Sequence, residues 1–404
     1  MGSVCPWPLV CPAPDDFVKV LHVIPSVAPR YGGPSRAVTD MCRASLGVGI
    51  ETLIATTDAD GDGRLGVELN RAISYQGVPT IFFRRQWSEA FKYSRHLARW
   101  LDARVREFDA VHIHAVFSHA CLAAADSCRR HRVPYIVRPL GTLDPWSLRQ
   151  KRARKMLFWR LGVSRMLKGA AAIHYTALPE RQLAEQSLGL KRGVVIPLGV
   201  ELDSSDDGER VKGSSINESL QGQPFVLVMS RLHQKKGLEL LLHAFAPLVK
   251  KREFAGWRLA LAGDGDPGYV ESLRRLVREL DCEGDVIFTG WLEGAQKKAL
   301  LQGAALLALP SYQENFGLCV IEALSYGVPV LVSSHVNLAP EIEAAGAGWV
   351  TELESSALES KLAETFRDAD ERRRRGANGR ELVSRRFTWN AIAADLAALY
   401  DSVV

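Results

Sequence analysis

The chain has 404 residues, which at about 150 residues per domain suggests two or three domains. Hydrophobic residues make up 47% and charged residues 24%, and these globular values exclude disordered, collagen-like and disulfide-scaffold classes. The net charge of +5 conceals an asymmetry. Residues 1–200 hold 28 basic and 16 acidic residues (+12), whereas residues 201–404 hold 23 and 30 (−7). A basic half joined to an acidic half suggests two lobes that meet different partners.

The first half begins with residues 1–16, which lack the basic start of a signal peptide and contain several prolines. We expect a disordered lead-in there. From residue 17, apolar runs alternate with longer helical patterns. The predicted strands are Val18–Ile24, Thr52–Thr56, Thr80–Phe83, Ala110–His114, Tyr135–Arg138, Ala171–Tyr175 and Val194–Ile196. The predicted helices are Pro34–Leu46, Glu89–Glu107, Ser118–His131, Leu148–Leu167 and Pro179–Ser187. This alternation predicts a doubly wound parallel-sheet domain over residues 17–200.

The polar, turn-rich residues 201–223 are expected to form a linker or loop. The alternation then restarts and predicts a second doubly wound domain over residues 224–386. Its predicted strands are Phe225–Met229, Arg258–Ala262, Val286–Phe288, Ala304–Leu309, Pro329–Val332 and Gly348–Val350. Its predicted helices are Leu238–Lys251, Tyr269–Leu280, Gly294–Gln302, Gly317–Tyr326 and Ser355–Phe366, and a terminal helix, Trp389–Tyr400, follows within residues 387–404. Ligands of such sheets bind at the carboxyl ends of the strands, so we expect a cleft between the two lobes.

The seven cysteines are scattered and odd in number, which is typical of a reduced cytosolic protein and not of a disulfide framework or a zinc site. No apolar run approaches ~20 residues, so no transmembrane helix is expected. We therefore expect a cytoplasmic protein whose contact with a membrane, where it occurs, is peripheral.

Three groups of residues in the second half follow predicted strands. Arg231 and Lys236 lie in the first loop, where two fixed cations suit a diphosphate leaving group, although a solvated basic loop is the alternative. Gly263 belongs to a Gly-Asp-Gly turn that would allow close backbone approach to a ligand. Glu314 precedes a helix that contains Glu322, and these carboxylates can accept hydrogen bonds from sugar and ribose hydroxyls. The free N–H groups at the start of that helix can bind phosphate oxygens.

The first half holds matching elements. Tyr31, Gly32 and Gly33 lie between the first strand and its helix, where paired glycines allow close backbone approach. His112 and His114 share one face of a strand, with His114 nearer the carboxyl end. These two could bind a metal, but no third ligand is evident, and a hydrogen-bonded histidine in the cleft is favoured. The segment from Arg138 to Gly141 could line the same cleft.

Together these motifs resemble the retaining glycosyltransferases of family 4, also called group 1, which have the GT-B architecture. The resemblance covers roughly residues 17–402. Its most specific carriers are Arg231 with Lys236-Gly237 and the pair Glu314 and Glu322 with Phe316-Gly317 between them. It implies two Rossmann-like domains facing across a cleft, with the C-terminal helix packed on the first domain. Ser230 and Leu198 depart from the family's usual Gly and Asn.

The resemblance implies transfer of a hexose from a UDP- or GDP-type sugar, with retention of configuration and without a metal or other cofactor. Arg231 and Lys236 would bind the diphosphate, Glu314 the donor sugar, and Glu322 the ribose. The backbone of Asn315, Phe316, Gly317 and Leu318, together with Gly33 and Gly263, would meet the donor. His114 would act near the reacting sugar, and Tyr31, Gly32, Arg138 and Gly141 would lie on the acceptor side.

Residues 145–160 interleave basic and aromatic side chains, a pattern that can bind an anionic membrane surface. A solvated helix with one face in the core is the alternative, and no nucleic-acid motif is present. We expect a bacterial surface-polysaccharide enzyme (exopolysaccharide, O-antigen or capsule) with a glycan acceptor linked to a lipid diphosphate. A GT-B sugar-nucleotide isomerase or phosphorylase, or an inactive nucleotide-sugar-binding protein, remains as an alternative.

Overall fold

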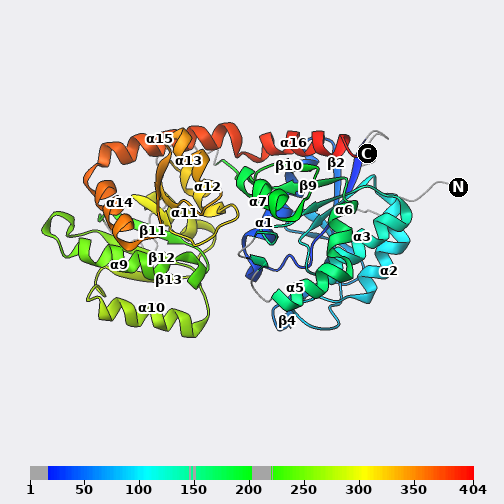
Figure 1. Cartoon of the computed structure of the whole chain (residues 1–404), viewed down its shortest axis with the longest axis horizontal. Coiled ribbons are helices and arrows are strands. Elements are labelled where there is room, and N and C mark those ends of the chain that lie inside the picture. The colour runs from blue at the N-terminus through cyan, green and yellow to red at the C-terminus, as the bar shows by residue number, and fades with distance from the viewer. Residues whose placement is uncertain (1–16, 145–146, 149–151, 203–219, 221) are drawn as a thin grey trace. The chain divides into compact units, whose positions relative to one another are not determined.

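The computed structural model describes residues 17–144, 147–148, 152–202, 220 and 222–404 (Figure 1). The expected lead-in, residues 1–16, and most of the expected linker, 201–223, lie outside these residues. The chain divides into two compact units, one running to Gly199 and including Trp389–Val404, and the other spanning Val200–Thr388. Each unit contains its own parallel sheet, so the prediction of two doubly wound α/β domains is confirmed.

The first unit has an eight-stranded sheet in the order β10-β9-β8-β7-β1-β2-β6-β5. Its strands are β1 (Val18–Val23), β2 (Ile50–Thr57), β5 (Ala72–Tyr75), β6 (Val78–Phe83), β7 (Ala110–His114), β8 (Tyr135–Arg138), β9 (Ala172–Tyr175) and β10 (Gly193–Val195). The pairs are parallel except β5 with β6. The sequence analysis missed β5, which a two-residue turn joins to β6. Gln76 and Gly77 both have positive φ there, as a hairpin turn requires.

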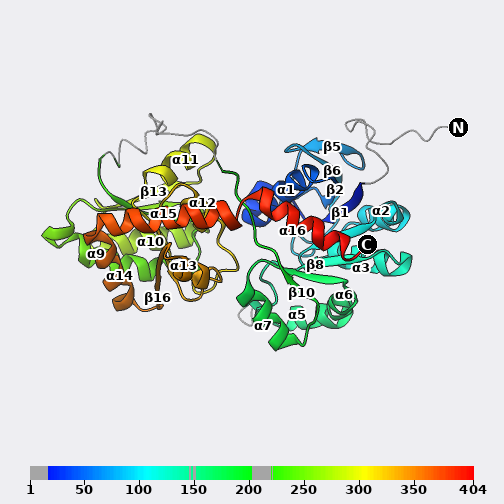
Figure 2. The same cartoon turned by 90° about the horizontal axis from the view of Figure 1, so that it is seen from above.

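The helices of the first unit are α1 (Gly33–Leu46), α2 (Arg95–Arg104), α3 (His119–His131), α5 (Arg152–Phe158), α6 (Ser164–Gly169), α7 (Leu178–Leu188) and α16 (Trp389–Asp401). A small hairpin, β3 (Ala59–Asp60) with β4 (Gly63–Arg64), completes the unit. Figure 2 shows α16 beside α1, and the two helices contact each other. The C-terminal helix therefore belongs to the first unit.

Two predicted helices of this unit were wrong in extent. The predicted helix Glu89–Glu107 begins only at Arg95, because Ser94 caps it by accepting the Leu97 N–H, and Lys92 has a positive φ. The predicted helix Leu148–Leu167 is divided between α5 and α6 by a π-helical turn, Trp159–Val163, in which Gly162 has a non-helical backbone.

The second unit has a six-stranded parallel sheet in the order β13-β12-β11-β14-β15-β16. Its strands are β11 (Phe225–Met229), β12 (Arg258–Ala262), β13 (Val286–Gly290), β14 (Leu306–Leu309), β15 (Val330–Ser333) and β16 (Gly348–Thr351). Its helices are α9 (Leu238–Val249), α10 (Pro267–Glu279), α11 (Gly294–Gly303), α12 (Leu318–Ser325), α13 (Ala339–Ala345), α14 (Ser355–Arg367) and α15 (Ala369–Arg386). Figure 1 shows α10 and α15 on opposite sides of this sheet.

The sequence analysis missed α13 and α15. The longer of them, α15, is polar on most of its surface, so hydrophobic periodicity does not identify it. It packs through small residues instead, since a Cβ on Gly376 would lie 1.9 Å from the Gly327 carbonyl oxygen. Arg375 also places its guanidinium over the Trp349 ring, with 4.5 Å to the ring centroid. These tertiary contacts, and not local sequence, hold α15 against the sheet.

Among the described residues, none of the helices combines the length and the apolar character that crossing a lipid bilayer requires.

Candidate active site

Both sheets reverse their strand order beside the first strand of their unit. In the first unit β1 lies between β2 and β7, and in the second unit β11 lies between β12 and β14. Ligands of doubly wound sheets bind at the carboxyl ends of the strands that flank such a reversal. The predicted site residues follow these strands: Gly33 comes after β1, His114 ends β7, Lys236 comes after β11 and Glu314 comes after β14.

In the second unit the two loops at the reversal are joined to each other. The Tyr312 N–H donates a hydrogen bond to the Lys235 carbonyl oxygen over 2.9 Å. Gly237 has a φ of +65°, and a Cβ there would lie 2.1 Å from the Pro310 carbonyl oxygen. Any larger residue at position 237 would therefore force the loops apart. This close packing fixes the loop that carries Lys236 beside the loop that carries Glu314.

Gly263 joins a third loop to this pair. Its φ is +139°, and a Cβ there would lie 1.9 Å from the Ser230 carbonyl oxygen. The Leu232 N–H donates to the Asp264 carbonyl oxygen over 2.8 Å, which continues the contact. Because glycine has no side chain, the loop after β12 can pack directly on the loop after β11 at Gly263.

The predicted charged residues of this unit form ion pairs. Lys236 and Glu314 are paired directly, and the Lys297 Nζ lies 2.6 Å from Oε1 of Glu322. All four side chains are 16–21% exposed, so these charges are largely removed from water. The sequence analysis missed Lys297, which comes from α11, because only the fold brings α11 beside α12. Arg231 is exposed and makes no ion pair with any residue that the structure describes.

Cys319 lies among these charges, in the first turn of α12. Burial raises the pKa of its thiol to about 12, and the side chains that act on it electrostatically are Lys236, Glu314, Glu322 and Lys297. A thiol with this pKa stays protonated and is a poor nucleophile. The groups here that can bind or stabilise a charged ligand are therefore the two lysines and two carboxylates around Cys319, not its thiol.

The start of α12 depends on Gly317, which has a φ of +80°. The Phe316 ring is buried against Phe387, and the Asn315 carbonyl oxygen accepts a hydrogen bond from Asn337 Nδ2 over 3.1 Å. Since the Phe316 side chain is in the core, this residue can meet a ligand only through its backbone. Leu318, the first residue of α12, is partly exposed.

In the first unit, Tyr31 and Gly32 precede α1. The Tyr31 hydroxyl donates to Glu89 and accepts the Gly61 N–H over 2.9 Å, and burial together with Glu89 raises the pKa of Tyr31. This hydroxyl therefore connects two neighbouring loops. Gly32 has a φ of +71°, and no atom lies within 4 Å of a Cβ built on it, so open space adjoins its backbone.

Arg138 ends β8, and its side chain is 1% exposed. Its Nε and Nη1 have no hydrogen-bond partner among the described residues. Burial lowers its pKa to about 10, while the charge of Glu180 acts in the opposite direction. The Glu180 carboxylate accepts hydrogen bonds from the Gly141 N–H at 2.9 Å and the Thr176 N–H at 2.8 Å. Sequence reasoning missed Glu180, whose place in the first turn of α7, after Pro179, is the local signal that could have found it.

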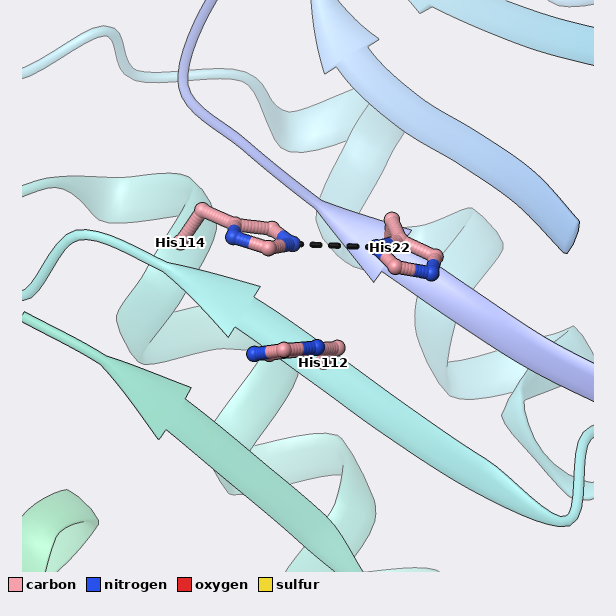
Figure 3. Close-up of side chains that lie close together, drawn as sticks. All are labelled: His22, His112 and His114. Atoms are coloured by element: carbon pink, nitrogen blue, oxygen red, sulfur yellow. Dashed lines mark hydrogen bonds between the residues drawn. The ribbon is translucent and has the colours of Figure 1, made fainter. Parts of the chain in front are cut away.

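Four histidines of the first unit lie together in a fully buried cluster, three of which are drawn in Figure 3. His22 comes from β1, His112 and His114 from β7, and His174 from β9. Burial is the main cause that lowers the pKa of each ring, to about 3 for His22 and His174, and the nearby Arg138 charge adds to it. The sequence signal for His22 and His174 was available, since each interrupts an otherwise apolar strand.

The hydrogen bonds of this cluster favour a polar network over a metal centre. His22, His112 and His114 could place ligand nitrogens within 4.8 Å of one another. However, both nitrogens of His112 already have partners, Tyr400 at 2.9 Å and His174 at 3.2 Å. The His112 and His114 rings are also stacked, with 4.4 Å between centroids, whereas metal ligands direct the lone pairs in their ring planes at one point.

Comparison with protein families gives two matches that together cover most of the chain. Residues 32–199 match the "Glycosyl transferase 4-like domain", and residues 212–382 match "Glycosyl transferases group 1". The first match contains the histidine cluster except His22, and the second contains Lys236, Glu314, Lys297 and Glu322.

Among curated relatives, the D-inositol 3-phosphate glycosyltransferase of Corynebacterium efficiens is 29% identical over 177 residues, which are 43% of this chain and 42% of that protein. Alignments to the first three relatives span 42–46% of their lengths, so the chain matches less than half of each. The GDP-mannose:cellobiosyl-diphosphopolyprenol alpha-mannosyltransferase of Komagataeibacter xylinus is 23% identical over 401 residues, covering 96% of this chain and 94% of its own.

Two solved structures show the same fold over nearly the whole chain. HepE of Anabaena, solved with UDP and glucose, has a TM-score of 0.76 at 20% identity and covers 95% of this chain and 100% of its own. The sucrose-phosphate synthase of Thermosynechococcus elongatus has a TM-score of 0.72 at 21% identity, covering 95% and 98%. The fold is thus that of the GT-B glycosyltransferases.

The histidine cluster predicts a dependence of stability on pH. A histidine whose pKa is lowered on folding binds a proton when the chain unfolds, so its stabilising contribution is present above about pH 6.5 and is lost as pH falls toward 3. Each such histidine contributes up to about 1.4 kcal/mol per pH unit. Replacing His174 by Leu should therefore reduce, by about this amount, the slope of the free energy of unfolding against pH between pH 6 and pH 4.

Urea unfolding at a series of pH values measures this slope. Above pH 7 the curves for wild type and His174→Leu should run parallel, which serves as the internal control. Parallel curves between pH 6 and pH 4 as well would contradict the prediction.

Proposed function

Since the chain belongs to the glycosyl transferase group 1 family, we propose that it transfers a hexose from a nucleotide-diphosphate sugar to a glycan acceptor with retention of configuration. The observation that carries the proposal is the pair Lys236 and Glu314, which lie on the two loops that follow β11 and β14. A partly buried cation and a carboxylate on adjacent loops suit the two ends of a sugar diphosphate.

The ion pairs suggest how a donor would bind. A diphosphate entering beside Lys236 would replace Glu314 as the partner of that ammonium group, because phosphate oxygens carry more negative charge. Glu314 would then be free to accept hydrogen bonds from sugar hydroxyls. In the same way, ribose hydroxyls would donate to Glu322, which Lys297 now holds in place. Each carboxylate is thus kept in position by a lysine until the donor arrives.

The reaction would depend on charge. Cleaving the bond between the anomeric carbon and the diphosphate leaves negative charge on the phosphate oxygen and positive charge on the carbon. Lys236 and Arg231 would stabilise the departing diphosphate without a metal ion. The acceptor hydroxyl would attack from the face that the phosphate leaves, and the phosphate oxygen would take its proton. The described residues show no carboxylate that we assign as a nucleophile.

The relatives guide the choice of substrates. The Komagataeibacter enzyme is named for GDP-mannose and a diphosphopolyprenol-linked cellobiose, and a relative from Salmonella typhimurium is named for colanic acid biosynthesis. We extend this to the chain as a UDP- or GDP-sugar donor and a saccharide acceptor on a lipid diphosphate, used in bacterial surface-polysaccharide synthesis. A sugar-nucleotide isomerase or phosphorylase and an inactive binding protein are the alternatives that the tests below separate.

The segment after residue 145 bears on a membrane-bound acceptor. The side chains of Phe158 and Trp159 pack against the core of the first unit. These two aromatics therefore belong to the core-facing side of the helix and are not membrane contacts. Met156, Leu157 and Leu161 are 45%, 55% and 63% exposed. Residues 145–146 and 149–151, and the side chains of Arg152 and Arg154, lie outside what the structure describes. We propose that the exposed apolar side chains and their basic neighbours contact an anionic membrane from the cytoplasmic side.

Donor binding predicts a thermal shift. A nucleotide sugar at a hundred times its dissociation constant should stabilise the protein by about 2.7 kcal/mol, so a screen of UDP, GDP, ADP and their sugars identifies the donor. Lys236→Ala should lose most of this shift, because the diphosphate loses its partly buried cation. Lys251→Ala is the matched control, since Lys251 pairs with Glu359 on the exposed surface. If no nucleotide shifts the wild type, donor binding is refuted.

Transfer is tested with the donor so identified and a synthetic cellobiosyl-diphosphate lipid. Free nucleoside diphosphate should appear with a new glycoside only when the lipid is present, and EDTA should leave the rate unchanged. NMR of the product should show the anomeric configuration of the donor. An inverted product would refute retention, while a changed donor sugar without any glycoside would favour the isomerase.

Membrane contact is tested by sedimentation with vesicles that contain phosphatidylglycerol. Replacing both Leu157 and Leu161 by Asp should reduce the bound fraction at least about fivefold, because two apolar contacts become repulsive charges. The control is Val48→Asp, at a residue that is 40% exposed on the turn after α1. Equal bound fractions for the wild type and the double variant would refute the proposed membrane contact.

A further inference from the structure

His22 and His114 form an isolated pair within the histidine cluster. The His22 Nδ1 and the His114 Nε2 are 3.0 Å apart, and both rings are fully buried (Figure 3). The other two nitrogens, His22 Nε2 and His114 Nδ1, have no hydrogen-bond partner among the residues that the structure describes. A buried polar atom without a partner costs free energy, so each of these nitrogens requires a partner that the described side chains do not supply.

The remaining histidines have assigned protons. The Ile196 carbonyl oxygen can only accept, so His174 carries its proton on Nε2, which lies 2.8 Å away. The Nδ1 of His174 must then accept from His112 Nε2, and the His112 Nδ1 accepts from the Tyr400 hydroxyl. This series of hydrogen bonds ends at the Ile196 carbonyl oxygen, and both ring nitrogens of His112 and of His174 have a partner. Within the described chain, His22 is therefore the side chain that decides which nitrogen of His114 is protonated.

Two arrangements of the pair are possible, and they differ in which of the two rings carries the N–H that has no partner in the described protein. Either His114 Nε2–H donates to His22, which leaves His22 Nε2–H as a buried donor without an acceptor, or His22 Nδ1–H donates to His114. The second leaves a lone pair on His22 Nε2 and an N–H on His114 Nδ1, so each arrangement has one N–H and one lone pair without a partner in the described protein. Position distinguishes them: the second arrangement places this N–H on His114, the last residue of β7, at the sheet edge where ligands bind, so a ligand oxygen there would favour it.

Arg138 stands beside His114 in the register of β7 with β8, and its Nε and Nη1 also lack partners in the described chain. The Nδ1–H of His114 and the two Arg138 donors therefore come from neighbouring strand ends. These three donor nitrogens have no acceptor in the described protein, and oxygens of a sugar or a phosphate could accept from them.

We propose that His22 is a positioning residue for the transfer reaction: by donating Nδ1–H to Nε2 of His114, it keeps the proton of His114 on Nδ1, directed at an oxygen of the sugar substrate. The proposal rests on the function proposed above. Without the His22 bond, the His114 proton can move to Nε2, and the substrate oxygen then faces a lone pair.

The first arm of the test needs no substrate. The ¹⁵N resonances of histidine-labelled full-length protein report which ring nitrogen carries the proton. We expect His114 to be protonated on Nδ1 in the wild type and to become a mixture of both forms in His22→Leu. A wild-type His114 protonated on Nε2 would overturn the proposal.

The second arm measures release of nucleoside diphosphate from GDP-mannose and from UDP-glucose in the presence of the cellobiosyl-diphosphate lipid. His22→Leu should lower kcat about tenfold and change KM for the donor less than about twofold, since one hydrogen bond of orientation is lost. His22→Asn should restore most of the rate, because its amide can donate from about the position of Nδ1. The matched control is His174→Leu, which removes another buried histidine of this sheet and should keep the wild-type kcat.

The outcomes separate the two proposals. A wild type that releases no nucleoside diphosphate from either sugar when the lipid acceptor is present would refute the proposed activity on these donors, whatever the ¹⁵N spectra show. Two outcomes would overturn the role of His22 while leaving the proposed activity intact. In the first, the wild type is active and His22→Leu has the same kcat. In the second, His22→Leu and His174→Leu lose kcat equally and His22→Asn does not restore it.

Discussion

The reversal of strand order beside β1 and β11 is the constraint on which the rest of the molecule depends. The connection after β1 runs toward β2 while the one after β7 runs toward β8, and those after β11 and β14 likewise run in opposite directions along their sheet. The loops on the two sides of each reversal therefore diverge at the carboxyl edge. In the second unit, Gly237 and Gly263 bring those loops into contact through backbone carbonyls, which no side chain would permit. The charged residues then stand on backbone that is fixed by packing.

The two units solve the problem of buried polarity differently. The second unit pairs its charges, Lys236 with Glu314 and Lys297 with Glu322, so that neither sign is left without compensation. The first unit keeps the four histidines of its buried cluster neutral, because burial, with the charge of Arg138 nearby, lowers the pKa of each of these rings. A charged ligand can replace one member of an ion pair. A neutral imidazole ring instead offers one donor and one acceptor nitrogen, each with a fixed direction. The proposed donor and the proposed sugar contact draw on these two properties.

The C-terminal helix takes part in the second of these arrangements. Tyr400 of α16 donates to His112, and its ring lies edge-on to both His112 and His22. The sequence patterns predicted this helix from its amphipathic period but contained no sign of this contact, because 288 residues separate the two partners. The same holds for Lys297 and Glu180, whose importance comes from neighbours on other elements. By contrast, Gly237, Lys236 and Glu314 were predicted because each stands next to an apolar strand.

The sequence by itself determined the parallel strands and most of the helices, since a buried parallel strand must be a short apolar run and its helix must carry an apolar stripe. It also determined which residues stand at strand ends, because that depends only on counting along the chain. The tertiary structure alone decided how those residues are paired, that α15 is a helix, and which histidines share one buried cluster. Those properties depend on contacts between elements far apart in sequence, where burial and neighbouring charge set each side chain's partner and protonation.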